Sequence, residues 1–234
     1  MKLLAVETAT EACSAALFVD GEMLERFEIA PQQHTKLILP MIDSLLAQAG
    51  LKPADLDALA FGCGPGSFTG VRIATGVIQG IAFGLDIPVV PVSTLAALAQ
   101  GFFNHNAADL DVVFSAMDAR LGEIFWGVYQ RDGQGFAQLI GQEAVTPASS
   151  VISSEVQGVG VGSAWAVYQD ELKICLGDKV NYYETQHLPS AGNVAQLGVY
   201  GFEQGLAVSA ESAIPVYLRD KVAKTELERK ALIP

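Results

Sequence analysis

A glycine-rich segment in the first third of the chain has the residue types that bind anions. It reads Gly62-Cys63-Gly64-Pro65-Gly66-Ser67-Phe68-Thr69-Gly70 and lies between an apolar run and a helical pattern. Turns of this kind bind phosphate through free backbone N–H groups and the positive end of the helix dipole. The segment lacks the Lys-Ser/Thr pair of a P-loop and the glycine spacing of a dinucleotide-binding turn. Two interpretations stay open: an anion cradle, or a tight turn made rigid by Pro65.

Acidic and basic side chains beside predicted turns are the next candidates. Glu7 and Thr8 follow the first apolar run, at the carboxyl end of a predicted strand, where α/β folds place ligands. Asp118 and Glu123 flank a later turn. Acids at such places also cap turns, so both roles stay open. Arg72 falls in the first turn of an apolar helix, where the helix dipole disfavours a cation, and we expect it to have a carboxylate or carbonyl partner.

Nucleophilic and metal sites are poorly supported. Ser67 is not in a G-x-S-x-G elbow, the turn that exposes a serine nucleophile. His34, His105 and His187 have no second histidine at helical spacing, since Ile38 stands four residues after His34. The three cysteines are widely spaced and match neither a disulfide framework nor a zinc site. We therefore predict no metal, and we expect the cysteines to be small buried hydrophobic residues in a reducing compartment.

Hydrophobic periodicity predicts the elements that position these residues in the first half of the chain. The Asp20-Gly21 pair predicts a hairpin, Pro88 and Pro91 predict an edge strand, and Ser67 is a candidate helix N-cap. Pro40 predicts a kink in its helix or a late start. Strands are expected at 2–8, 13–19, 22–30, 56–62 and 87–92, and helices at 34–49, from Ser67 to about Gly84, and at 94–103.

The second half repeats this plan after a polar stretch at 104–111, which we take as the boundary between domains 1–103 and 104–234. A helix is expected to begin at Pro147, and the tail at 214–218 is expected to be extended, before a charged segment at 221–230. The other expected elements are strands at 112–117, 123–130, 134–144 and 156–161 and a helix at 190–206. Three antiparallel strands followed by alternating helices and strands thus occur twice.

Two of the predicted helices have unusual faces. The apolar stripe of the helix at 34–49 is wider than one core face requires, because Leu37 and Leu39 extend it. The helix after Ser67 carries Gly76, Gly80 and Gly84, four residues apart, although each interior glycine costs about 1 kcal/mol relative to alanine. Such a smooth stripe allows another backbone to approach closely. Packing within the chain and packing against a partner explain it equally well.

The composition excludes several classes of protein. The chain has 234 residues, a formal net charge of −12 and a pI near 4.6, with 50% hydrophobic and 17% charged residues. A disordered chain has the reverse composition, and a protein that binds nucleic acid unaided is normally basic. The apolar stretch 70–90 is interrupted by Arg72, Gln79, Asp86 and Pro88, so we predict no membrane helix and a cytoplasmic location.

Several motifs together resemble the TsaB (YeaZ) family. They are Leu4-Ala-Val-Glu-Thr-Ala-Thr10, Gln33-His34 with Leu39-Pro40, the segment from Gly62 through Arg72 to Gly76, Asp118-Ala-Arg120, and Pro215-Val-Tyr-Leu-Arg219. The resemblance extends over the whole chain. It implies the two-lobe actin/Hsp70/sugar-kinase fold, an α/β fold of duplicated mixed sheets flanked by helices. It also implies a role in forming N6-threonylcarbamoyladenosine (t6A) in tRNA.

The resemblance further implies a non-catalytic subunit with no cofactor. Such subunits bind a TsaD-like transferase, are joined by the small TsaE-like ATPase, and reach tRNA only through the complex. The His-x-x-x-His metal motif of TsaD-like proteins is reduced here to His34 and Ile38, and the turn after the first strand lacks the usual glycine. A residual nucleotide site at Glu7 and Thr8 is weakened but stays open.

We expect the two unusual helices to pack against the equivalent pair of the partner, as in a four-helix bundle. A homodimer through the same face is expected when the partner is missing. Two alternatives remain: a nucleotide-dependent kinase or ATPase of the same fold, and a glycoprotease-like metallopeptidase. The expected contact residues are Leu37, Met41, Leu45, Ala74, Gly76 and Gly80.

Overall fold

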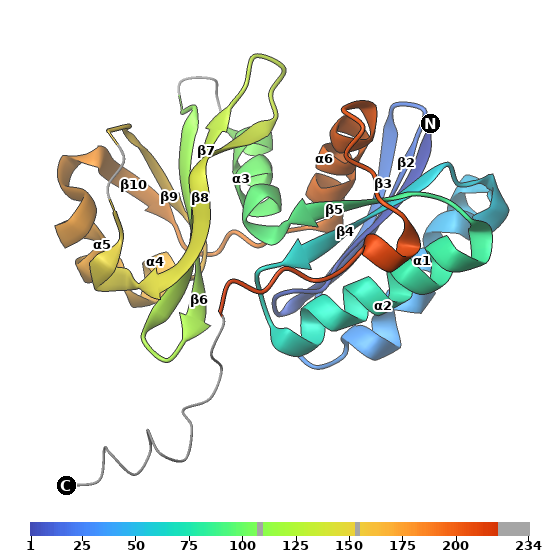
Figure 1. Ribbon diagram of the computed structural model, residues 1–234, viewed down its shortest axis with the longest axis horizontal. Coiled ribbons are helices and arrows are strands. Elements are labelled where there is room, and N and C mark those ends of the chain that lie inside the picture. Colours follow the sequence, from blue (N-terminus) through green and yellow to red (C-terminus); the bar gives the residue numbers. More distant parts are fainter. Residues whose placement is uncertain (107–109, 153–154, 220–234) are drawn as a thin grey trace, which may run out of the picture.

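Two five-stranded sheets of the same topology form the frame of the molecule (Figure 1). The computed structural model describes residues 1–106, 110–152 and 155–219. In the first sheet, β1, β2 and β3 are antiparallel neighbours, whereas β1, β4 and β5 run parallel. The strands are β1 (Lys2–Glu7), β2 (Ala12–Val19), β3 (Glu22–Ile29), β4 (Ala58–Gly64) and β5 (Val89–Ser93), in the order β3-β2-β1-β4-β5.

The second sheet repeats this order and these strand directions. Its first three strands are antiparallel neighbours, and β6, β9 and β10 run parallel. The duplication confirms the actin/Hsp70/sugar-kinase fold class expected from the sequence. The strands are β6 (Val112–Arg120), β7 (Glu123–Arg131), β8 (Ala137–Pro147), β9 (Gly158–Val161) and β10 (Val180–Glu184), in the order β8-β7-β6-β9-β10.

Local sequence signals account for the strand ends. Asp20 and Gly21 both adopt positive φ, as the predicted hairpin turn between β2 and β3 requires. The proline-containing β5 lies at an edge of its sheet, as predicted. The helix expected to begin at Pro147 is absent, because that residue still pairs with Glu123 in the sheet and only a 3₁₀ turn, Ala148–Ser150, follows it.

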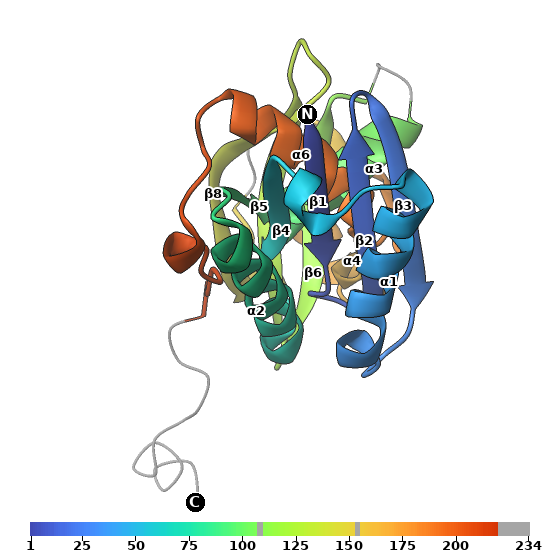
Figure 2. The same ribbon diagram turned by 90° about the vertical axis from the view of Figure 1, so that its right-hand side faces the viewer.

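The helices lie on both faces of each sheet (Figures 1 and 2). On the outer face of the first sheet, α1 (His34–Ala49) and α2 (Phe68–Leu85) lie side by side. The second lobe carries α4 (Ala164–Val167) and α5 (Gln169–Leu176), which, like β10, the sequence did not predict. A late start of α1 at Pro40 is wrong, since the helix begins at His34 and buries six residues along its length.

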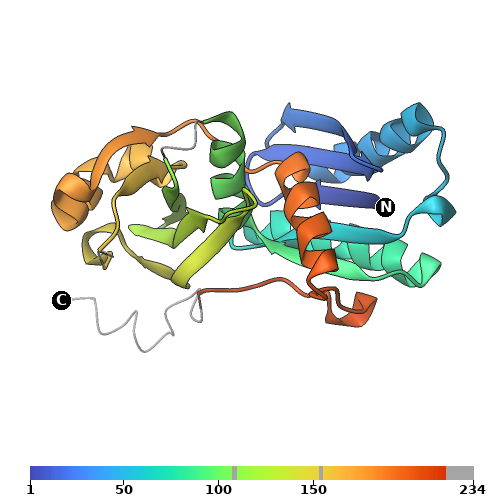
Figure 3. The same ribbon diagram turned by 90° about the horizontal axis from the view of Figure 1, so that it is seen from above.

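Two helices occupy the space between the sheets, and each packs against the sheet of the other half of the chain (Figure 3). The first, α3 (Thr94–His105), follows the first sheet in sequence but packs on the second. The second, α6 (Ala191–Glu203), follows the second sheet but packs on the first. The proposed domain boundary after residue 103 therefore falls within α3, and the division at that residue stays a prediction.

The chain after α6 returns to the first lobe. Val208 forms a bridge with Val89, and the Val216 N–H donates to the Cys63 carbonyl at 2.8 Å. The segment expected to be extended therefore runs beside β4 without joining the sheet. The charged segment expected at 221–230 lies outside the described residues.

In the described part of the chain, α2 is the one helix long and apolar enough to cross a membrane by length and composition. Arg72 and Gln79 lie within this helix, yet it still meets that criterion of length and composition. From the sequence alone, these interruptions were expected to exclude a membrane helix. Six of its residues are buried within the protein, including Ala74 and Ile78. A core helix that packs against a sheet has the same composition, so this single helix is weak evidence for a membrane.

Candidate functional site

The glycine-rich turn joins β4 to α2 and packs against the turn between β1 and β2. A Cβ atom at Gly66 would lie 2.6 Å from the Ala9 carbonyl oxygen, and one at Gly70 would lie 2.0 Å from that of Thr8. The Ser67 N–H donates to Ala9 O at 2.7 Å, and Thr8 Oγ1 donates to Gly70 O at the same distance. Close contact between two backbone turns therefore explains these glycines without a bound anion.

The N-terminus of α2 carries the two features predicted for it. Ser67 is the N-cap, and its Oγ accepts a hydrogen bond from the Gly70 N–H at 3.4 Å. Arg72 Nη1 donates to the Phe68 carbonyl at 2.9 Å, which confirms the expected carbonyl partner. The guanidinium also lies over the rings of Phe68 and Tyr217, at 3.3 and 4.9 Å from their centroids. This cation–aromatic stack is at the surface, since Phe68 is 61% exposed.

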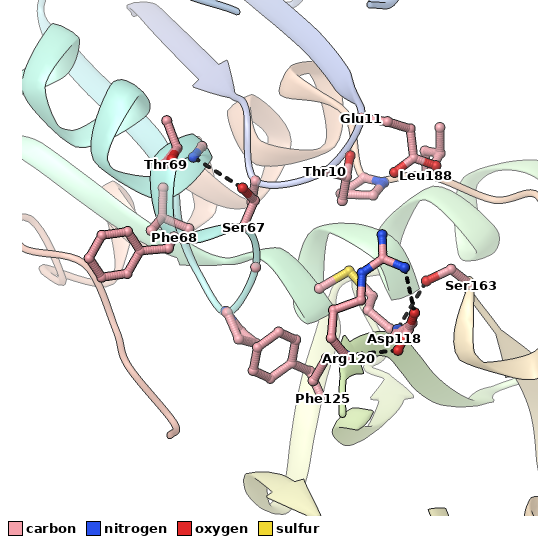
Figure 4. A pocket seen from close by; sticks show the side chains of 18 of the residues that line it. Thr10, Glu11, Ser67, Phe68, Thr69, Asp118, Arg120, Phe125, Ser163 and Leu188 are labelled. Carbon is pink, nitrogen blue, oxygen red and sulfur yellow. Dashed lines mark hydrogen bonds and ion pairs between the residues drawn. The ribbon is translucent and has the colours of Figure 1, made fainter. Parts of the chain in front are cut away.

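A cleft of about 1070 Å³ separates the two lobes beside this turn (Figure 4). It lies at the carboxyl ends of β1, β4, β6 and β9, the strand ends at which α/β folds place ligands. Polar side chains from both lobes line it, and Met117, Phe125 and Val167 add apolar surface. The polar residues include Thr10, Glu11, Ser67, Thr69, Asp118, Arg120 and Ser163.

The second lobe presents Arg120 to this cleft. Arg120 has a φ of +63°, an uncommon conformation for a residue with a side chain. Asp118 holds it there, because Asp118 Oδ1 accepts from the Arg120 N–H at 2.8 Å and Oδ2 lies 3.2 Å from Nη1. Ser163 Oγ in turn accepts from the Asp118 N–H. Figure 4 shows the guanidinium extending toward Thr10 of the first lobe.

Glu7 and Thr8, the candidates for a residual nucleotide site, are fully buried and do not line the cleft. Glu7 Oε1 accepts from the Ala9 N–H at 2.6 Å, and Oε2 accepts from Thr94 Oγ1 at 3.3 Å. Burial raises the pKa of this carboxyl to about 7, an effect that these hydrogen bonds oppose. Both residues are thus engaged by groups of the protein itself.

His34 has a structural role in this arrangement. Its Nε2 atom lies 3.0 Å from Thr10 O and 3.1 Å from Ala12 O, so the ring joins the start of α1 to the turn after β1. A metal centre would require several donor side chains around one point. Within the described ranges, no group of three or more His, Cys, Asp or Glu side chains is arranged to hold a metal ion.

The outward side of α1 and α2 is the second candidate surface. Cβ atoms added at Gly76, Gly80 and Gly84 would have no heavy atom within 4 Å. The glycine stripe therefore faces away from the protein, which removes internal packing as its explanation. Phe83, on the same helix, is 78% exposed, and Leu39 on α1 is 52% exposed.

The structure changes the set of residues available on this surface. Met41, Leu45 and Ala74 belong to the hydrophobic core between the helices and the first sheet, with exposed fractions of 9, 0 and 0%. Met41 and Leu45 face inward because the wide apolar stripe of α1 is used mainly for packing on the sheet, and Ala74 lies on the buried side of α2. Of the expected contact residues, Leu37 is half-buried, whereas Gly76 and Gly80 are exposed.

Comparison with known proteins decides the family. The chain is 42% identical to the tRNA threonylcarbamoyladenosine biosynthesis protein TsaB of Escherichia coli, over 98% of this chain and all of that protein. It is 39% identical to TsaB of Haemophilus influenzae, over 97% of each chain. The chain belongs to the TsaB family. The match confirms the resemblance inferred from the sequence motifs and makes this chain a TsaB-type protein of t6A biosynthesis.

Two further comparisons agree with this membership. The structure of YeaZ from Pseudomonas aeruginosa superposes with a TM-score of 0.85 at 41% identity, covering 93% of this chain and 99% of that one. Residues 28–227 match the model of the TsaD family, described as tRNA N6-adenosine threonylcarbamoyltransferase. The sequence pattern of the TsaD family thus extends over most of this chain.

Sequence reasoning missed several residues that line the cleft or the outward surface. Ser163 and Phe125 reach the cleft from the second lobe, and Phe83 stands out from α2. The segment 215–219 was noted as a family motif and as part of an extended tail, but its position at the cleft, which Tyr217 and Arg219 border, was not predicted. The signal available for Phe83 was its place beside the glycine stripe, one residue before Gly84.

Proposed function

We propose that this TsaB-family chain is a non-catalytic scaffold subunit that binds a TsaD-like transferase through the outward side of α1 and α2. The observation that carries the proposal is the open glycine stripe. Gly76, Gly80 and Gly84 have free space beyond them, although each lowers the stability of the helix. A stripe without side chains allows a partner helix to approach the backbone of α2 closely.

The neighbouring side chains fit a contact with another protein. Phe83 and Leu39 are large apolar residues exposed beside the stripe, and Leu37, Ile73 and Val77 are only partly buried. Exposed aromatic side chains of this kind are typical anchors of protein interfaces. We therefore place the contact over Leu37, Gly76, Gly80 and Phe83, with Met41, Leu45 and Ala74 supporting it from beneath.

The scaffold role is also consistent with the chemistry around the cleft. Glu7 and Thr8 bond to groups of the protein itself, and His34 bonds to two backbone carbonyls. The chain has a formal net charge of −12, which suits a subunit that holds the enzyme while the assembled complex holds the tRNA. We further propose that a TsaE-like ATPase joins this pair in the cytoplasm, and that the same surface forms a homodimer when the transferase is missing.

The test is to place a large cation in the glycine stripe. Gly80→Arg is expected to weaken binding of the TsaD-like subunit at least about tenfold, because the side chain separates the two helix backbones. Ile174→Arg is the matched control, since Ile174 is 83% exposed on α5 of the second lobe. Titration calorimetry measures the affinity, and a reconstituted reaction measures t6A in tRNA with each variant.

Equal binding by the two variants would place the partner elsewhere. The inter-lobe cleft supports a second candidate, a kinase or ATPase of the same fold, because its volume and position at the strand ends suit a nucleotide. Titration of the isolated chain with Mg-ATP separates the candidates. Micromolar binding with turnover would contradict the scaffold proposal, whereas t6A formation that requires this chain without such turnover supports it.

A further inference from the structure

The segment 213–219, which we name the C-terminal strap, connects α2 to the second lobe. Residues 213–217 of the strap lie beside α2: Gln79 Nε2 donates to Ala213 O at 3.0 Å, and the Tyr217 ring lies 6.4 Å from that of Phe68. Figure 1 shows this last coloured part of the chain running from the side of α2 toward β6. The strap thus touches the helix on which we have placed the partner.

The strap is fixed to the first lobe at the end of β4. The Val216 N–H donates to Cys63 O at 2.8 Å. The Val216 carbonyl approaches Gly64 so closely that a Cβ atom there would lie 2.9 Å from it, and Gly64 has a φ of +104°. Two features therefore favour glycine at position 64. Its positive φ disfavours a residue with a side chain, and the strap passes too closely to leave room for one.

The strap is fixed to the second lobe by one side chain. Arg219 Nη2 donates to Glu123 Oε2 at 2.6 Å and to Ala119 O at 3.0 Å. Both acceptors belong to the hairpin of β6 and β7 that also presents Arg120 to the cleft. Because residues 216–219 line the cleft as well, the strap crosses from one lobe to the other at its edge.

The strap is held by few contacts. Within it only Ala213 is buried, whereas Ile214, Val216 and Tyr217 are 61, 41 and 48% exposed. It forms no helix or strand, and it is attached by the hydrogen bonds at Gln79, Cys63, Ala119 and Glu123 and by the contact of Tyr217 with Phe68 and Arg72. Segments with little buried apolar surface open at low free energy. We therefore expect its attachment to the second lobe to open at a lower free energy than the packed core of either lobe.

We propose that the C-terminal strap is a latch between the lobes that sets the opening of the cleft and links that opening to the partner surface on α2. With Arg219 bound to Glu123, the lobes are held together and Tyr217 is ordered against Phe68 and Arg72. With the latch released, the cleft widens, and a partner on α2 binds to a surface whose edge is no longer ordered. The link between the opening of the cleft and the partner surface on α2 rests on the proposed function.

The opening is measured by fluorescence transfer between dyes on the two lobes of the full chain. Dyes are attached at Ala47→Cys on α1 and Ile174→Cys on α5, both exposed positions, with Cys175→Ser to remove the neighbouring thiol. Arg219→Ala and Glu123→Gln are each expected to lengthen the distance between the dyes, and the double variant is expected to add nothing further. Arg120→Ala is the control, because Arg120 pairs with Asp118 within its own hairpin.

The link to α2 is measured as the affinity for the TsaD-like subunit. Arg219→Ala is expected to weaken binding at least about fivefold, the lower range of usual coupling between two sites. An unchanged distance in Arg219→Ala would overturn the latch, and a longer distance with unchanged affinity would overturn the link to α2. Failure of the unaltered chain to bind the transferase would overturn the proposed function instead, while the distance measurement still tests the latch.

Discussion

Glu7 is an acidic residue at the end of a strand, yet its side chain is fully buried in the protein. It is the last residue of β1, where a ligand-binding acid is expected, but it points into the protein and contacts Gly62 on the neighbouring strand. A Cβ atom at Gly62 would lie 1.8 Å from Glu7 Oε2, so only glycine leaves room for the carboxyl. Two hydrogen bonds partly offset the loss of water around the charge. The carboxyl is therefore a buried structural group with a raised pKa.

The contribution of Glu7 to the stability of the protein should fall as the pH rises from about 4.5 through about 7. Burial raises the pKa of Glu7 from 4.5 to about 7 in the folded state, so across this range the folded state binds more protons than the unfolded state. The total loss from this group is about 3 kcal/mol at higher pH. Chemical denaturation of the wild type and Glu7→Gln at pH 4.5 and pH 8 measures it.

Glu7→Gln, which carries no titrating proton, should gain stability relative to the wild type by about the same amount between these two pH values. The comparison cancels the titration of the other carboxyl groups, which are shared by both proteins. Parallel pH profiles for the two proteins would contradict the raised pKa of Glu7.

At the scale of elements, the turn before α2 and the helix itself use glycine for opposite reasons. Gly66 and Gly70 have backbone atoms of the β1–β2 turn directly against them. Gly76 and Gly80, about two and three helical turns after Gly70, have open space. In the turn, glycine permits contact within the chain, whereas on the helix it leaves a surface that another molecule can approach.

Alanine substitutions should separate these two roles. Gly70→Ala places a Cβ atom 2.0 Å from Thr8 O, and we expect it to lower the free energy of unfolding by at least about 2 kcal/mol. Gly76→Ala meets no atom and should raise this free energy by up to about 1 kcal/mol, because alanine favours the helix. Urea denaturation followed by circular dichroism measures both, and changes of the same sign would contradict the assignment.

At the scale of the whole molecule, the exchange of helices between the lobes makes each core depend on the other half of the chain. The inner face of the first sheet is completed by Ala191, Val194 and Ala195 of α6, more than a hundred residues after β4. The second sheet is likewise covered by Leu95, Leu98 and Phe102 of α3. Neither lobe has a complete core by itself, so we expect the two to unfold together.

Tryptophan fluorescence tests this dependence, because both tryptophans, Trp126 and Trp165, belong to the second lobe. Leu45→Ala removes a fully buried side chain from the first lobe and should lower the stability by about 2–5 kcal/mol. If the lobes unfold together, the fluorescence midpoint in urea shifts as far as the midpoint from circular dichroism. A fluorescence midpoint that stays at the wild-type value would show that the second lobe unfolds independently.

The sequence by itself determined most of the longer elements and the family. Hydrophobic period, the Ser67 cap and the Asp20-Gly21 turn act between residues a few positions apart, so they located most strands and α1 without tertiary information. The short elements α4, α5 and β10 lack a long periodic pattern and were missed for that reason. The glycine-rich motif identified the family but did not say what each glycine contacts.

Only the tertiary structure decided which faces are buried and which are open. Periodicity predicts that a helix has an apolar face, but the outward direction of the stripe at Gly76 and Gly80 depends on where the first sheet lies. The burial of Glu7 depends on Gly62 and Thr94, and the attachment of Arg219 depends on Glu123, all distant in the sequence. These contacts arise when segments far apart in the chain pack together, so no local pattern of residues encodes them.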